Sequence, residues 1–130
     1  MKTLKNLLLV FVLGLISTQG FCKSAIRFIN DSELIRASGN GDLEKVKSLI
    51  RKGAKVNKKN EDGKTALMEA SKYGHLEVVK FLVEKGADIN AKDKYDNSAF
   101  SYSFMFGSRD VREYLKSKGA KVQAKDEYDF

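Results

Sequence analysis

Apolar residues in the middle of the chain recur at helical spacing in two short segments, each followed by a glycine. Thr65 is a suitable N-cap for a first helix that ends near a turn at Gly74. A second helix starts near His75, and its apolar positions are Leu76, Val79, Leu82 and Val83. Gly86 follows at the position where a helix end needs a left-handed residue. The pattern predicts a unit of two short helices joined by turns.

The same unit recurs along the chain with a period of 33 residues and no gaps. The matching positions are Gly41, Gly74 and Gly107; Gly53, Gly86 and Gly119; Leu49, Leu82 and Leu115; and Ser32, Thr65 and Ser98. We therefore expect an all-α solenoid of three stacked helix-turn-helix repeats with connecting β-turn loops. The expected repeats are about 32–60, 61–93 and 94–130, within a domain at 32–130 that follows a lead-in at 21–31.

The middle unit resembles an ankyrin repeat. The resemblance is carried by Asp62-Gly63-Lys64-Thr65-Ala66-Leu67, Gly74-His75-Leu76-Glu77-Val78-Val79 and Gly86-Ala87-Asp88-Ile89-Asn90-Ala91. It covers about three repeats, from Ser32 to the end of the chain. Met68 stands where the family has a histidine, which removes that histidine's contacts between repeats. The resemblance implies a protein-binding module rather than an enzyme.

The second helices differ in polarity at the two ends of the predicted stack. Val46 and Val79 match Arg112, whereas Lys45 matches Val78 and Val111. Because an end repeat needs apolar residues only on its inner side, we expect both caps to be present in these three repeats. Phe104 replaces a serine and is expected to lie over the core at the open end, with Tyr128 and Phe130 nearby. The residues Ile26, Phe28 and Ile29 are candidates for covering the other end.

The first 20 residues have the pattern of a secretory signal. Lys2 and Lys5 precede the apolar run Leu7 to Leu13, and small residues follow it. We expect a signal peptide at 1–20, with cleavage after Gly20 or as late as Cys22. An uncleaved anchor or a buried helix is the alternative, although the run is short for a membrane span. Cys22 is the only cysteine, so an internal disulfide is excluded; lipid attachment there is a minor alternative.

The chain is basic, with a formal net charge of +7 that falls to +5 when Lys2 and Lys5 leave with the signal. The first repeat holds a basic group: Lys45, Lys47, Arg51, Lys52, Lys55, Lys58 and Lys59. We interpret it mainly as a solvated helix face. Its alternative role is contact with an anionic surface of the cell envelope. Export argues against nucleic acid as the partner.

No catalytic or metal-binding constellation is visible in the sequence. His75 is the only histidine and stands at a helix start, which favours a structural role, and the usual zinc spacings are absent. Composition leaves room for a Ser-His-Asp triad, but no nucleophile motif supports one. Gly39-Asn40-Gly41 lacks the spacing of a phosphate loop. The recurring loop acids Asp88, Asp93, Asp96 and Asp126 are best explained by loop hydrogen bonds. We therefore expect no enzyme activity, no cofactor and no metal, with a hydrolytic enzyme as the weakest alternative.

In proteins of the resembled family the partner usually lies along the concave side, formed by the loop tips and first helices. Carried over by position, that surface consists of Asp62, Lys64, Lys72, Tyr73, Lys94, Tyr95, Asn97, Met105 and Phe106. Tyrosine rings beside lysines suit protein recognition, while Met105 and Phe106 have stack capping as an equal alternative. The expected function is an adaptor, scaffold or inhibitor that binds a protein in the periplasm or outside the cell, as a monomer.

Overall fold

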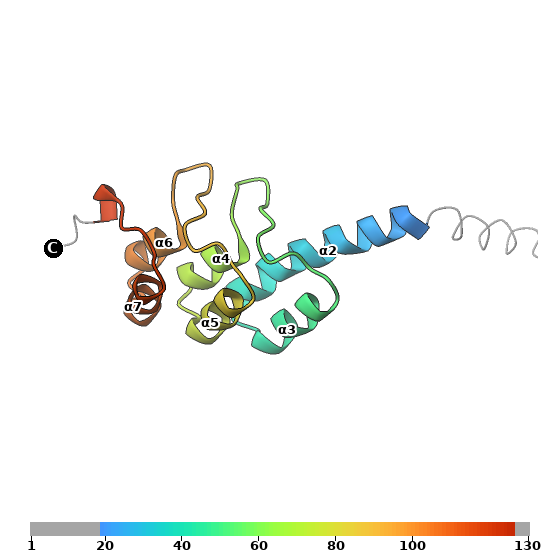
Figure 1. Cartoon of the computed structure of the whole chain (residues 1–130), viewed down its shortest axis with the longest axis horizontal. Coiled ribbons are helices and arrows are strands. Elements are labelled where there is room, and N and C mark those ends of the chain that lie inside the picture. Colours follow the sequence, from blue (N-terminus) through green and yellow to red (C-terminus); the bar gives the residue numbers. More distant parts are fainter. Residues whose placement is uncertain (1–18, 127–130) are drawn as a thin grey trace, which may run out of the picture.

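The computed structural model of the chain describes residues 19–126, with side chains from Ser24 onward. Its helices are α2 (Gln19–Asn40), α3 (Leu43–Arg51), α4 (Ala66–Lys72), α5 (Leu76–Glu84), α6 (Ala99–Met105), α7 (Arg109–Ser117) and the short 3-10 helix η1 (Ala124–Asp126). These residues contain no strand. Figure 1 shows α2, α4 and α6 in one layer and α3, α5 and α7 in a second, with two long loops rising at one edge. The predicted stack of three helix pairs is confirmed.

In the second and third repeats the helices begin and end at the residues that the sequence indicated, whereas α2 begins well before Ser32. Thr65 caps α4, since its Oγ1 accepts a hydrogen bond from the backbone N–H of Met68 at 3.3 Å. Ser98 caps α6 in the same way through Ser101, at 3.2 Å. Gly86 has a φ of 92°, as required just beyond the end of α5. The local signals for helix starts and stops are therefore correct.

The core lies between the two helix layers and differs at the two ends of the stack. Val46 and Val79 are fully buried on the second helices, whereas Arg112 at the matching position is half-buried. The Arg112 guanidinium lies 5.5 Å from the centre of the Phe104 ring. Phe104 is half-buried beside this guanidinium, and its place over the core at the open end stays a prediction.

Side-chain amides join successive repeats at the same 33-residue interval as the sequence pattern. Asn57 accepts from the N–H of Asp88 at 2.7 Å and donates to the carbonyl of Gly86 at 3.1 Å. Asn90 repeats both bonds one unit later, with Lys121 and Gly119. His75 Nε2 lies 2.9 Å from the carbonyl oxygen of Gly39 in the preceding repeat. This contact gives His75 a structural role between repeats.

Helix α2 is much longer than the other helices, and its first half projects beyond the stack (Figure 1). The predicted boundary between lead-in and domain, at residues 31 and 32, falls inside this helix. Ile26, Phe28 and Ile29 do not cover the end of the core as proposed from the sequence, because each is more than half exposed. The predicted signal peptide at 1–20 lies outside the described residues except for Gln19 and Gly20, which belong to α2. The predicted contacts of Tyr128 and Phe130 also lie outside the described residues.

Two buried serines on the first helices have no hydrogen-bond partner among the described residues. They are Ser38 and Ser71, at equivalent positions of α2 and α4, and neither is accessible to solvent. An unsatisfied buried hydroxyl costs free energy, and alanine is also the better helix former. We expect Ser71→Ala to raise the free energy of unfolding by about 1 kcal/mol, measured by urea denaturation. Ser103→Ala is the control: Ser103 Oγ donates to the carbonyl of Phe100 at 2.7 Å, so its loss gives no gain.

Candidate functional site

Two aromatic residues occupy equivalent positions at the ends of neighbouring first helices. Tyr73 is the C-cap of α4 and Phe106 is the C-cap of α6, and the exposed fraction of each is 55%. Met105, beside Phe106, is 54% exposed. Because these large side chains remain more than half exposed, they contribute little to the core. These side chains are available to a partner.

Lys72 lies between the two rings. Its ammonium nitrogen is 5.2 Å from the ring centre of Tyr73 and 5.3 Å from that of Phe106. Lys72 forms no ion pair within residues 24–126. The Tyr73 ring also approaches Gly39 of α2, where an added Cβ would lie 3.6 Å from Tyr73 Cδ2. The side chains of Lys72, Tyr73, Met105 and Phe106 are called the aromatic–lysine cluster below.

Lys64 and Glu69 connect this cluster to the loops. Their side chains form an ion pair at 3.6 Å and are mostly buried. The Lys64 ammonium also lies 5.5 Å from the ring centre of Tyr102, and that ring stacks on Phe106 at 6.4 Å. Lys64 is thus already paired within the fold and has less freedom to meet a partner than the sequence suggested. Tyr102 and Glu69 support the surface and were missed by the sequence analysis.

The tips of the two long loops are held against each other. The N–H of Lys94 donates to the carbonyl of Asp62 at 3.1 Å, and their side chains form an ion pair at 3.0 Å. The hydrogen bond that the Lys94 ammonium donates to Asp62 is the main cause that raises the pKa of Lys94 above its ordinary value. Gly63 permits this contact: its φ is 75°, and a Cβ there would lie 3.0 Å from the backbone nitrogen of Lys94. Tyr95 is 61% exposed at the tip.

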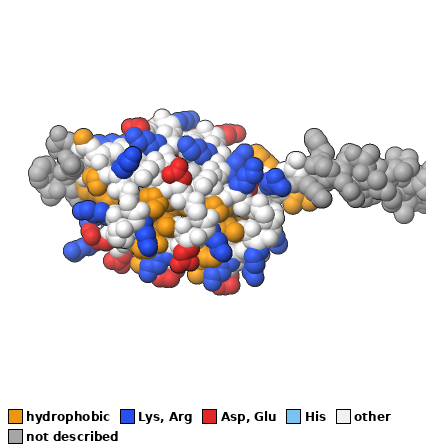
Figure 2. Space-filling view, viewed as in Figure 1, with side chains coloured by type: hydrophobic (Ala, Val, Ile, Leu, Met, Phe, Trp, Pro, Cys, Tyr) orange, Lys and Arg blue, Asp and Glu red, His pale blue; other side chains and the backbone are white. Residues whose placement is uncertain are grey.

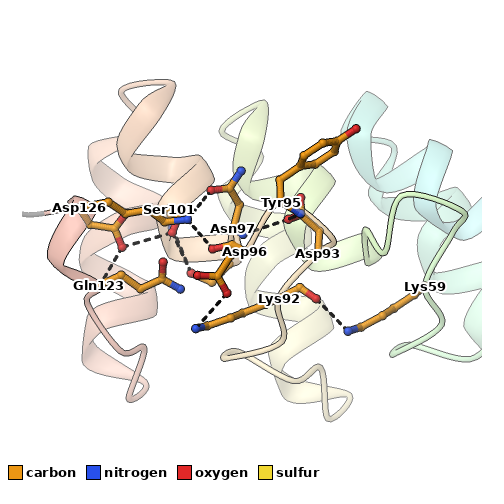
Figure 3. A network of polar contacts seen from close by, with 11 residues as sticks. Lys59, Lys92, Asp93, Tyr95, Asp96, Asn97, Ser101, Gln123 and Asp126 are labelled. Carbon is orange, nitrogen blue, oxygen red and sulfur yellow. Dashed lines mark hydrogen bonds and ion pairs between the residues drawn. The ribbon is translucent and has the colours of Figure 1, made fainter.

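Asp93 closes the second loop, as Figure 3 shows. Its Oδ1 accepts from the backbone N–H groups of Tyr95 and Asn97, both at 2.9 Å, and its Oδ2 accepts from the hydroxyl of Tyr102. Burial raises the pKa of this carboxyl, but the hydrogen bonds outweigh it and leave the pKa below the ordinary value. Burial and the bond to Asp93 raise the pKa of Tyr102 to about 12. The prediction that loop acids serve loop hydrogen bonds is confirmed for Asp93.

Asn97 also belongs to this loop network more than to the open surface. It is half-buried, and its side-chain oxygen accepts from the ammonium of Lys125 at 2.8 Å. Asp126 repeats the role of Asp93 one unit later, accepting from Gln123 and Ser101 (Figure 3). Among the predicted surface residues, the exposed ones are thus Tyr73, Lys94, Tyr95, Met105 and Phe106. They form two groups, one at the loop tips and one at the ends of the first helices.

Two open clefts lie along α2 and were not foreseen from the sequence. The larger has a volume of about 600 Å³ and is lined by Phe28 and Ile35 on one side and by Lys58, Lys59 and Asn60 on the other. The smaller, about 380 Å³, continues past Arg36 toward Lys64 and Glu69. Within the described part of the chain, no group of three or more His, Cys, Asp and Glu side chains is placed to hold a metal ion. No described helix is long and apolar enough to span a membrane.

The fold defines a small helical-repeat protein with exposed aromatic side chains at its loop tips and helix ends. The family model for ankyrin repeats, in three copies, matches residues 34–126. The chain therefore belongs to the ankyrin-repeat family, as its sequence indicated. Ankyrin repeats are generally protein–protein interaction modules rather than enzymes. A comparison with curated proteins finds no match.

Proposed function

We propose that this chain is exported and then binds a protein partner through the aromatic–lysine cluster and the neighbouring loop tips. The family supports protein binding as the general function. The basic, apolar and small-residue order of residues 1–20 supports export, to the periplasm or outside the cell. The partner-specific role is that of an adaptor, scaffold or inhibitor.

The observation that carries the proposal is the exposure of Tyr73 and Phe106 with Lys72 between them. Aromatic rings contribute a large contact area and lose little side-chain entropy on binding. The ammonium between the rings can pair with a partner's carboxylate at the centre of that apolar contact, where water is excluded. Both rings stand at the ends of packed helices, so their backbone positions are set before the partner arrives, which lowers the cost of association.

Charges at the loop tips extend the surface at its rim. Lys94 and Tyr95 lie next to Asp62, and the ion pair between Lys94 and Asp62 is half-exposed. Exposed pairs of this kind contribute little stability, so a partner can rearrange them at small cost. Rim charges of this type guide encounter and orientation more than they add affinity.

The test is a double substitution, Tyr73→Ala with Tyr95→Ala, in the protein used as bait against the fraction that holds exported proteins. Once the captured partner is purified, we expect the double variant to bind it roughly 100-fold more weakly. The melting temperature should change little, because both rings are more than half exposed. Affinity is measured by titration calorimetry and the melting temperature by circular dichroism.

The matched control is Lys121→Ala with Val122→Ala, which removes an exposed cation and an exposed apolar side chain outside this surface. This control should bind like the unchanged protein. Equal affinity of the tyrosine double variant would remove the surface from consideration. N-terminal sequencing of the protein recovered from the same fraction tests export independently, since a start at Met1 would contradict signal removal.

A further inference from the structure

The projecting half of α2 carries apolar side chains that the repeat stack does not cover. Ile26, Phe28 and Ile29 are 57%, 64% and 59% exposed. Ile26 and Ile29 each lie seven residues, or two helical turns, before Glu33 and Arg36, so they share the side of α2 that bears those two charged residues. Glu33 and Arg36 pair with each other in contact with solvent, at 2.5 Å.

The described helices of the stack leave these residues uncovered. The buried side of α2 carries Leu34, Ile35 and Ser38, which pack against the other helices. Ile26, Phe28 and Ile29 precede this stretch, and each remains more than half exposed. Burying them requires a contact that the described residues do not provide.

Cationic side chains surround the same end of the molecule. Lys58 and Lys59 line the larger cleft opposite Phe28, and Lys55 lies beside α2 through the bond of its N–H to Asp31 Oδ1 at 2.6 Å. Arg27 is exposed on the helix between Ile26 and Phe28. Figure 2 shows Lys and Arg side chains gathered beside apolar ones where α2 leaves the stack.

These cations are mostly unneutralised. Across residues 24–126, none of Arg27, Lys55, Lys58 and Lys59 forms an ion pair, and the Lys59 ammonium donates to the carbonyl of Lys92 at 2.8 Å. The cleft also has three acidic residues. Asp31 is buried and accepts a hydrogen bond from the N–H of Lys55, and Asp62 is paired with Lys94. Among the described residues, Glu61 is therefore the exposed acid of this cleft that forms no ion pair. The surface thus combines exposed apolar side chains with an excess of positive charge.

We propose that this end of the protein, formed by the projecting half of α2 with Lys55, Lys58 and Lys59, docks on a lipid bilayer surface rich in anionic lipid. The isoleucines and Phe28 enter the boundary between headgroups and acyl chains, and the cations attract the anionic headgroups. The charge of this end supports this partner, because Arg27, Lys55, Lys58 and Lys59 form no ion pair among the described residues and complement anionic headgroups.

Three apolar side chains alone give weak membrane binding, and stable attachment needs a second contribution such as a basic patch. The structure supplies both on one end of the stack. The aromatic–lysine cluster of the second and third repeats is made by other residues, so it stays available to a protein partner. The inference is therefore independent of the proposed protein-binding function.

The absence of tryptophan from the chain permits a clean experiment. Phe28→Trp, in the full-length chain, places a single fluorescent reporter on the projecting helix, and Tyr73→Trp places one on the aromatic–lysine cluster. With vesicles of equal parts phosphatidylcholine and phosphatidylglycerol, we expect the emission of Phe28→Trp to shift to shorter wavelength. The emission of Tyr73→Trp should not shift. Circular dichroism checks that both variants keep the helical fold.

The electrostatic part is tested by Lys58→Gln with Lys59→Gln in the Phe28→Trp protein. Each lysine near an anionic surface contributes enough attraction that losing two should weaken vesicle binding on the order of 20-fold. The matched control, Lys116→Gln with Lys121→Gln, removes the same charge at the far end of the stack and should bind as before. Raising the salt concentration should weaken binding of the parent and abolish the difference between the two double variants.

Four results would overturn the proposal. The first is an unchanged emission of Phe28→Trp with the anionic vesicles. The second is an equal shift with vesicles of phosphatidylcholine alone, which would assign the binding to the apolar leader. A shift that grows with protein concentration without vesicles would show a second copy on this face. A shift without vesicles at every concentration would show that another segment of the chain covers Phe28.

Discussion

Removal of residues 94–130 is expected to abolish cooperative unfolding of the remaining chain. The deletion takes away α6 and α7, which pack against α4 and α5. Val79 is fully buried and Val83 half-buried, and both lie at positions where the third repeat has Arg112 and Lys116. Returning these two valines to water costs about 3 kcal/mol, and the amide bonds of Asn90 to the third repeat are lost as well.

Two repeats are also short of the number at which such stacks become stable, since each unit buries its apolar face only against a neighbour. We therefore expect a broad transition in urea with a reduced slope, in place of the sharp transition of the full chain. Circular dichroism at several denaturant concentrations measures both. A truncated protein that keeps the slope and free energy of unfolding would contradict the stacking argument.

A pair of substitutions makes this test reciprocal. Val79→Arg with Val83→Lys copies the polar positions of the third repeat onto the second. In the truncated chain these charges face water and should improve solubility and sharpen the transition. In the full chain they would be buried against α7, where an unpaired charge costs several kcal/mol, and should destabilise it strongly. The same change is thus expected to act in opposite directions in the two chains.

The stack itself was predictable because its signals are local and repeated. The N-cap at Thr65, the left-handed glycine at Gly86 and the polar switch from Val79 to Arg112 each follow from the residue type at one position, and the structure has all three. Because the pattern recurs every 33 residues, each signal is supported by the matching positions of the other repeats. A single copy of the same pattern would leave the pairing of helices undetermined.

The predicted surface was less complete, because its contacts join residues from different repeats. Tyr73 and Tyr95 are exposed as expected, since no core position needs them. Lys64 pairs with Glu69 and lies over Tyr102, and the latter contact spans two repeats, so the sequence gives no local sign of it. Asn97 was also assigned to the surface, but its bond with Lys125 joins two segments of the third repeat that lie 28 residues apart, so it too has no local sign in the sequence.

The ends of the stack show a second limit of sequence reasoning. Phe28 follows an apolar leader and has the residue type of a cap, which suggested burial. Burial depends on the neighbour that a side chain meets, and the projecting half of α2 has no helix of the stack beside it. Apolar character alone therefore does not distinguish a residue that covers a core from one that meets a membrane or a partner.

Asp93→Ala is expected to have the largest effect of any single substitution in the loops. It removes the acceptor for the N–H groups of Tyr95 and Asn97 and the carboxylate to which the buried hydroxyl of Tyr102 donates. Asp93 is almost fully buried, so water does not replace these bonds readily. We expect a loss of about 3 kcal/mol in the free energy of unfolding, measured by urea denaturation at pH 7.

Asp93→Asn is the matched variant, because Asn60 performs the same loop closure one repeat earlier. Asn60 Oδ1 accepts from the N–H groups of Asp62 and Lys64 at 2.9 and 3.0 Å. The amide should therefore retain the loop bonds and lose mainly the strength that charge gives to the bond with Tyr102. Its destabilisation is expected to be less than half that of the alanine variant. Equal destabilisation by both would show that charge, not loop closure, is the main contribution of Asp93.

The pH dependence separates these two contributions. The pKa of Asp93 in the folded protein is below its ordinary value of 3.8, because the bonds from Tyr102, Asn97 and Tyr95 outweigh the effect of burial. The stabilisation by the carboxylate is therefore complete well above pH 3.8 and is lost as the pH falls through the folded-state pKa. Asp93→Asn cannot be protonated in this range, so its stability should fall less steeply below pH 4 than that of the unchanged protein. Parallel curves for the two proteins between pH 5 and pH 2 would mean that Asp93 has the same pKa in the folded and unfolded chain, and that its hydrogen bonds do not favour the charged form.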